Sequence, residues 1–81
     1  MFKIGIVTHY YDKIGVGIIE LDGTLSVGDS IKFSKDGETL FEQKVDSIQV
    51  EHEKKETAGK GEVIGLKTKE PVKKGAEVFK L

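Results

Sequence analysis

The stretch that decides the fold reads Gly17-Ile18-Ile19-Glu20-Leu21-Asp22-Gly23-Thr24-Leu25-Ser26-Val27-Gly28-Asp29. It begins as a short β-branched run, which favours a buried strand over a helix. Asp22-Gly23 and Gly28-Asp29 then provide two tight-turn signals, because glycine accepts a positive φ without steric cost. Turns placed this close together leave room only for short strands, so the stretch predicts a small all-β domain.

The same alternation of strands and turns continues on both sides of this stretch. Residues 2–11 alternate, which predicts a strand with Ile4, Ile6 and Thr8 on one face and Gly5, Val7 and His9 on the other. Further strands are predicted at 30–34, 63–66 and 78–81, with turns at Asp36-Gly37 and Lys74-Gly75. Pro71 cannot donate a ladder hydrogen bond, so it is expected at a strand end or an edge.

Residues 38–58 allow two interpretations. Thr39 followed by Glu42 forms a capping-box pattern, and a helix would then present Phe41, Val45, Ile48 and His52 on one side and end at Gly59. The alternative is a long strand over about 40–53 with a β-bulge near Asp46-Ser47. The all-β character of the rest favours the strand, and residues 53–60 are predicted to form a polar loop.

Composition limits the class of protein. The chain has 81 residues, 37% of them hydrophobic and 33% charged, which predicts one globular domain over 1–81. It has no cysteine, which excludes disulfides, thiolate zinc sites and cysteine nucleophiles. No apolar run approaches the ~20 residues of a membrane span, and no signal peptide is recognisable. A cytoplasmic location is expected. Met1 leads directly into a strand, which favours a free-standing chain.

The charge balance argues against a dedicated nucleic-acid-binding protein. The 13 basic residues are all lysines, and the chain has 14 acidic residues, which gives a net charge of −1. Nucleic-acid-binding proteins usually have a basic excess and use arginine for bidentate contacts. One local cluster, Lys67, Lys69, Lys73 and Lys74, could contact a phosphate backbone. Its alternative interpretation is a solvated, charged edge that resists aggregation.

Catalytic and metal-binding patterns are not recognisable. His9 and His52 do not match a compact zinc motif, and neighbours on a strand point to opposite faces. The serines and threonines lack a histidine–carboxylate partner in a recognisable order. The sequence therefore predicts no catalytic residue, no cofactor and no metal site. His9, Tyr10 and Tyr11 form an aromatic cluster that could close the domain's end, contact a protein or stack on bases.

Several motifs together resemble a known domain. Residues 17–20 followed by 23–29 are similar to a strand and G-x-L-x-V-G-D turn in the second, β-barrel domain of the translational GTPases, typified by elongation factor Tu. Residues 45–49 resemble its V-x-S-I-Q strand, residues 58–66 its A-x-x-G-D-x-V-G-L hairpin, and residues 72–76 its V-K-K-G-D turn. Glu62 and Ala76 stand where that family commonly has Asp.

The resemblance implies a closed antiparallel barrel of six or seven strands and a link to translation. It implies no GTPase activity, because the chain lacks a G-x-x-x-x-G-K-[S/T] loop. The leading expectation is a non-catalytic module that docks on a protein or ribonucleoprotein, with no DNA or membrane partner. The alternative is direct RNA or tRNA binding through the lysine-rich C-terminal strands. The expected contact residues are Tyr10, Tyr11, Lys67, Lys69, Lys73 and Lys74.

Overall fold

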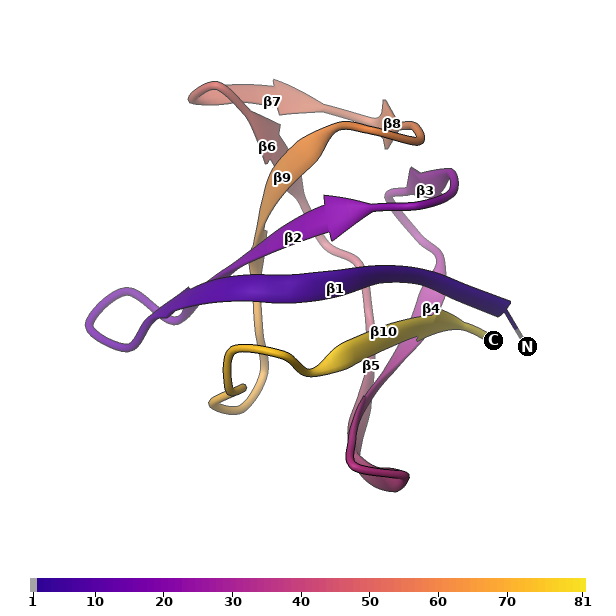
Figure 1. Cartoon of the computed structure of the whole chain (residues 1–81). Helices are drawn as coiled ribbons and strands as arrows, with labels where there is room; N and C mark the ends of the chain where they lie inside the picture. The colour runs from indigo at the N-terminus through magenta and orange to yellow at the C-terminus, as the bar shows by residue number, and fades with distance from the viewer. Residues whose placement is uncertain (1) are drawn as a thin grey trace.

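A computed structural model describes residues 2–81, which form ten β-strands and no helix (Figure 1). The strands are β1 Phe2–Tyr11, β2 Val16–Leu21, β3 Leu25–Ser26, β4 Ser30–Lys35, β5 Glu38–Lys44, β6 Ile48–Val50, β7 Glu53–Lys55, β8 Thr57–Ala58, β9 Val63–Lys67 and β10 Glu77–Lys80. The predicted all-β class is confirmed. One observation concerns the expected absence of a membrane span: residues 2–81 contain no helix long and apolar enough to cross a bilayer.

Eight strands form one antiparallel sheet, and β3 pairs with β8 in a second, two-stranded sheet. The order in the large sheet is β5-β4-β10-β1-β2-β9-β6-β7. In the described part of the chain, the ladder ends at β5 and β7, so the sheet does not close into the predicted six- or seven-stranded barrel. The reason lies between β5 and β6, where Val45 turns away from the edge and bonds to the backbone of Gly28 and Asp29.

Both sheets enclose one hydrophobic core. Its buried apolar side chains come from most of the strands and from the connections. Phe33 and Phe41 meet inside it with ring centroids 4.8 Å apart. Burial of this apolar surface is the main force that holds so small a domain together. The core members are Ile4, Val7, Ile19, Leu21, Leu25, Ile31, Phe33, Phe41, Val45, Ile48, Ala58, Ile64, Leu66, Val72, Ala76 and Val78.

Strand β1 departs from the predicted strict alternation. Its register shifts between Lys3 and Gly5 against β10, and between Val7 and His9 against β2. Each bulge changes which side of the strand faces the core, so Ile4 and Val7 are both buried. The predicted grouping of Ile4 with Ile6 and Thr8 is therefore wrong, because alternation holds only between bulges.

Residues 38–58 are strands, but not one long strand. β5 ends at Lys44, and a tight turn at Glu51 and His52 reverses the chain from β6 into β7. Both turn residues have positive φ, 51° and 67°, although neither is glycine. The predicted loop over 53–60 is likewise wrong in part, since β7 and β8 lie within it. No Gly or Asn marks this turn in the sequence, so the alternating pattern of Ile48, Val50 and His52 gives no sign that the chain reverses there.

Candidate interaction surface

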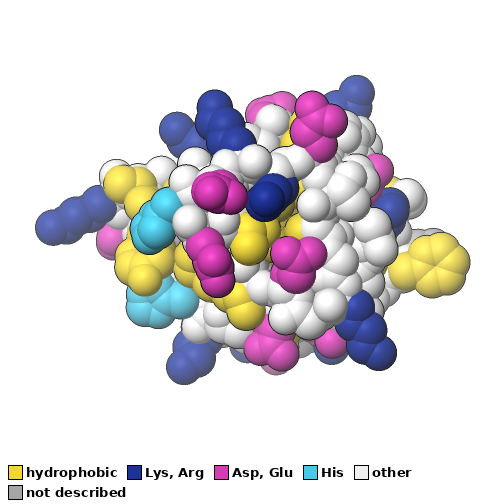
Figure 2. All heavy atoms as spheres, turned by 90° about the horizontal axis from the view of Figure 1, so that it is seen from above, with side chains coloured by type: hydrophobic (Ala, Val, Ile, Leu, Met, Phe, Trp, Pro, Cys, Tyr) yellow, Lys and Arg dark blue, Asp and Glu magenta, His cyan; other side chains and the backbone are white. Residues whose placement is uncertain are grey.

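An exposed apolar patch covers one end of the outer face of the large sheet. We call it the Ile14 patch; it consists of Tyr11, Ile14, Val16, Ile18 and Val63. Tyr11, Ile14 and Val63 are 48%, 61% and 51% exposed. The patch lines a hollow of about 270 Å³. Figure 2 shows hydrophobic side chains gathered next to histidine on one side of the molecule. A cluster of this kind on a small domain is a candidate interaction surface.

Local structure explains why these side chains face solvent. The backbone N–H groups of Ile14 and Gly15 both donate to the carbonyl of Tyr11, at 3.3 and 2.8 Å, which builds the turn between β1 and β2. Gly15 has a φ of 67°, a conformation that glycine adopts without strain. The turn therefore projects Ile14 away from the core, and this side chain is the most exposed member of the patch.

Gly65 on β9 forms the floor of the hollow. A Cβ at this position would lie 3.5 Å from Val16 Cγ1 and 3.8 Å from Ile18 Cδ1, which is ordinary contact distance. The absence of a side chain leaves the hollow deeper between these neighbours. On β9, Val63, Gly65 and Lys67 face outward while Ile64 and Leu66 are buried, as strand alternation requires.

The predicted aromatic cluster separates into two environments. The rings of His9 and Tyr11 lie on the surface with centroids 4.5 Å apart at an angle of 58°. Tyr10 is half-buried and packs against the hydrophobic core. Tyr11 therefore belongs to the Ile14 patch, whereas Tyr10 contributes to the interior. His52 lines the same hollow as Tyr11, from the turn between β6 and β7.

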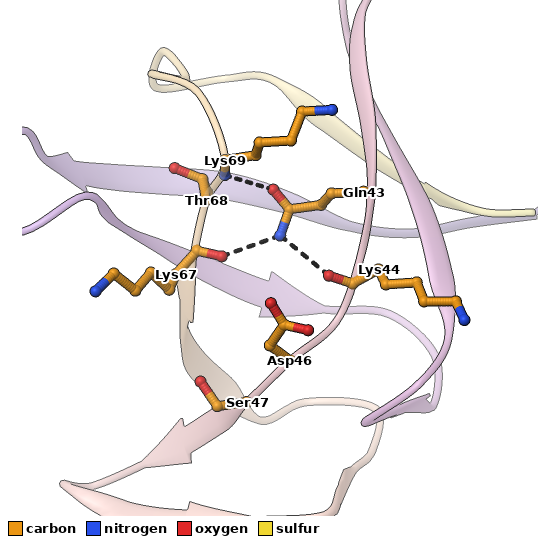
Figure 3. A pocket seen from close by; sticks show the side chains of 7 residues that line it. All are labelled: Gln43, Lys44, Asp46, Ser47, Lys67, Thr68 and Lys69. Atoms are coloured by element: carbon orange, nitrogen blue, oxygen red, sulfur yellow. Dashed lines mark hydrogen bonds between the residues drawn. The ribbon is translucent and has the colours of Figure 1, made fainter.

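At the other end of β9, a side chain bridges the open side of the sheet. Gln43 of β5 accepts a hydrogen bond from the backbone N–H of Lys69 at 2.7 Å and donates to the carbonyl of Lys67 at 3.0 Å (Figure 3). Its Nε2 also lies 3.4 Å from the carbonyl of Lys44. The amide of Gln43 thus takes the place of a peptide group in a ladder that β5 and β9 do not form.

A second hollow of about 470 Å³ lies beside this bridge. Lys44, Lys67 and Lys69 are exposed at its margin, and Figure 3 shows their side chains extending outward while Asp46 lies between the two strands. The ion pairs found among residues 2–81 use Lys3, Lys55 and Lys80 rather than these three lysines. The hollow is therefore basic at its margin, with one carboxylate inside. Its full lining is Gln43, Lys44, Asp46, Ser47, Lys67, Thr68 and Lys69.

A third hollow, of about 300 Å³, joins the other two. It shares Ile14, Val16, Gln49 and Gly65 with the apolar hollow. It shares Ser47 and Lys67 with the basic hollow. The three hollows are therefore neighbours along β9, and together we call them the outer groove. It is apolar at the Val63 end and basic at the Lys69 end.

The structure places only some of the predicted contact residues in the outer groove. Tyr11, Lys67 and Lys69 line the outer groove. Lys73 and Lys74 are exposed in the turn before β10 and line none of its three hollows. Sequence reasoning missed the apolar members Ile14 and Val63. An isoleucine beside a turn glycine, and the outward parity of Val63 on its strand, are the signals that could have identified them.

In the part of the chain that the structure describes, titratable side chains lie near the outer groove without forming a cluster of metal ligands. Among residues 2–81, no group of three or more His, Asp or Glu side chains could hold a metal ion. The two imidazoles lie near the apolar patch, His9 against Tyr11 and His52 in the lining of its hollow. The arrangement can desolvate apolar side chains at one end of the groove and attract negative charge at the other.

Comparison with known proteins finds a relative that is named a protease. Over 79 residues, 98% of its length, it is 37% identical to an uncharacterized protease of Methanocaldococcus jannaschii. The matched region is 19% of that protein, so the chain spans about a fifth of the length of the curated relative it matches. No protein-family model matches the chain.

Solved structures match the fold along nearly the whole chain. Two crystal structures of the C-terminal domain of a Geobacillus thermoleovorans protein assigned to the U32 peptidases, one a selenomethionine variant, superpose with TM-scores of 0.90 and 0.88 at 20% identity. The matches cover 99% and 98% of this chain, and 92% and 99% of those chains. At this identity the likeness concerns the fold.

The predicted kinship with the second domain of elongation factor Tu is therefore wrong, and so is the predicted link to translation. The sequence match is to a protease, and the fold matches are to the C-terminal domain of a U32-assigned protein. The motifs led to the wrong family for a physical reason. Each one encodes a glycine turn or a short alternating strand, and these are requirements of small β-domains in general.

Proposed function

We propose that this chain is a non-catalytic domain that binds extended polypeptide for a peptidase of the U32 type. The observation that carries the proposal is the exposed Ile14 patch on a chain that aligns, over 98% of its length, with one fifth of a protein named a protease. A cytoplasmic location is part of the proposal, in keeping with the absence of cysteine.

The surface favours an unfolded partner over a large folded one. The apolar members of the patch lie around a hollow of about 270 Å³, which suits one or two side chains. A stable contact between folded proteins usually buries about 800 Å² on each partner. An extended polypeptide can place single apolar side chains in such a hollow without needing a large complementary surface.

A direct test compares one protein in two conformational states. The purified 81-residue chain is mixed with native α-lactalbumin and, separately, with its reduced and carboxymethylated form, which stays unfolded, and binding is measured by fluorescence anisotropy. We expect binding only to the unfolded form. Peptide-bond hydrolysis, followed by mass spectrometry during prolonged incubation, is expected to be absent.

Substitutions in the patch provide the control for specificity. Ile14→Lys and Val63→Lys place a charge where an apolar contact is proposed, and each should weaken binding about tenfold, as expected for loss of one buried aliphatic side chain. Both side chains are exposed, so thermal unfolding should change little. Equal binding of native and unfolded α-lactalbumin, or unchanged affinity in both variants, would contradict the proposal.

A further inference from the structure

We infer that the outer groove selects an extended segment in which apolar residues are followed or preceded, within a few positions, by acidic ones. This inference rests on the proposed function and specifies the polypeptide that the groove accepts. Two features of the groove carry it: the lining residues that its three neighbouring hollows share, and the different chemistry of its two ends.

The apolar end provides the anchor. Gly65 lacks the side chain that would fill the space between Val16 and Ile18, and Val63 stands at the edge of this space. An aliphatic or aromatic side chain of a partner could displace water there and contact apolar groups on several sides. This contact supplies affinity. Glu51, the carboxylate in the lining of this hollow, disfavours an acidic residue of the partner at this end.

The basic end provides the selectivity. Lys44, Lys67 and Lys69 are exposed around the hollow that Gln43 spans, and Asp46 is the acidic side chain in its lining. Three lysines against one aspartate leave a local charge of +2 in a chain whose net charge is −1. A carboxylate in a partner is therefore attracted to this end, whereas a lysine or arginine is repelled.

Geometry sets the spacing between the two preferences. Val63, Gly65 and Lys67 all face outward on β9. At about 3.3 Å per residue, Val63 and Lys67 are roughly 13 Å apart along the strand. An extended segment that follows β9 spans this distance with about four of its own residues. The apolar and acidic side chains of the partner should therefore be about four positions apart.

The test uses labelled peptides of about eight residues, long enough to cover the groove. One has an apolar half and a glutamate-rich half, and a second has lysine in place of every glutamate. The 81-residue chain should bind the apolar–acidic peptide about tenfold more tightly, as expected for two surface ion pairs gained instead of two repulsions. The preference should decrease as salt is added.

Charge reversal supplies the decisive variant. In the double variant Lys67→Glu, Lys69→Glu, the preference should invert toward the apolar–basic peptide. The matched control, Lys73→Glu with Lys74→Glu, makes the same charge change at two exposed lysines outside the groove, and it should retain the original preference. Thermal unfolding of both double variants establishes that they are folded.

Three results would overturn the inference: equal affinity for both peptides, equal effects of the two double variants, or tighter binding of labelled oligouridine than of either peptide. The first two leave the proposed function standing if unfolded α-lactalbumin still binds with dependence on Ile14. Loss of that binding as well would remove the proposed function. Tight oligouridine binding would instead identify the basic end as an RNA contact.

Discussion

The side-chain amide of Gln43 joins the backbone of Lys69 across the open side of the sheet, with a hydrogen bond of 2.7 Å from the Lys69 N–H to Gln43 Oε1. The same amide donates to the carbonyl of Lys67. A planar amide with one donor side and one acceptor side can satisfy two backbone groups that a neighbouring strand would otherwise pair. One side chain thus connects β5 to the end of β9, where the ladder is interrupted.

Removing this amide should weaken the connection between β5 and β9. Gln43→Ala deletes both backbone hydrogen bonds and is expected to lower the free energy of unfolding by about 1–2 kcal/mol, at the level of two net hydrogen bonds. Urea denaturation measures this change, and amide hydrogen exchange at Lys69 should accelerate. Gln49→Ala, an exposed glutamine that faces the same side, is the control and should have little effect. Equal stability of the two variants would show that the bridge contributes nothing.

A glycine in β1 is required by the close approach of β2. A Cβ at Gly5 would lie 2.7 Å from the carbonyl oxygen of Glu20 and 2.9 Å from Ile19 Cγ2. The oxygen belongs to the paired strand and cannot move without breaking the ladder. Gly5→Ala is therefore expected to destabilise the domain by about 1–3 kcal/mol, the usual cost of overpacking. The drop should appear as a lower midpoint of thermal unfolding.

Gly59 is the matched control for this prediction. A Cβ there would approach only Glu62 Oε1, at 3.9 Å, and the φ of Gly59 is not in the left-handed region. Gly59→Ala should be neutral or stabilise by up to about 1 kcal/mol, because it restricts the unfolded chain. If both variants lost the same stability, the contact with Glu20 would not be the cause.

Some features of the fold and of the outer groove could be predicted from the sequence, and others could not. The turn at Asp36-Gly37 was predictable, because glycine reports a positive φ and its φ is 83°. The bulges in β1 were not, since they arise where β1 must pair with β2 and β10 at the same time. The outer groove could be predicted from the sequence only in part. Lys67 and Lys69 stand out as charges, but Gly65 matters through the neighbours around it, which requires the register between β2 and β9.

The turn between β6 and β7 stores strain that substitution should release. Glu51 and His52 both have positive φ, a conformation that costs a residue with a Cβ about 1 kcal/mol or more. The double variant Glu51→Asn, His52→Gly supplies the residue pair that such a two-residue turn prefers. We expect a gain of about 0.5–1 kcal/mol in urea denaturation, reduced from the full strain by the added entropy of glycine. The control, Lys54→Gly in the adjacent β7, should instead lower the free energy of unfolding. A lower free energy of unfolding in the turn variant would contradict this account.

Asp29 stabilises the turn before β4 in two separable ways. One carboxylate oxygen, Oδ2, accepts a hydrogen bond from the backbone N–H of Ser26 at 2.9 Å and lies 3.3 Å from Lys80 Nζ. Asp29→Ala removes both interactions and should cost about 2 kcal/mol, because a hydrogen bond to a charged acceptor is stronger than a neutral one. Asp29→Asn retains an acceptor for Ser26 and loses the ion pair, so its cost should be below about 1 kcal/mol.

Lys80→Met tests the same division from the other partner. It retains the hydrogen bond from Ser26 to a charged acceptor and most of the apolar stem of residue 80, but it removes both the ion pair and the 3.5 Å hydrogen bond from Lys80 Nζ to the carbonyl of Thr24. Its cost in urea denaturation should, like that of Asp29→Asn, stay below the cost of Asp29→Ala. Added salt should narrow the gap between the native chain and both of these variants, because the Lys80 side chain is about a third exposed and the ion pair is screened. The gap to Asp29→Ala should persist, since the lost backbone contact does not depend on screening. If Asp29→Asn proved as costly as Asp29→Ala, the charge on Asp29 would stabilise the turn and the hydrogen bond to Ser26 would be secondary.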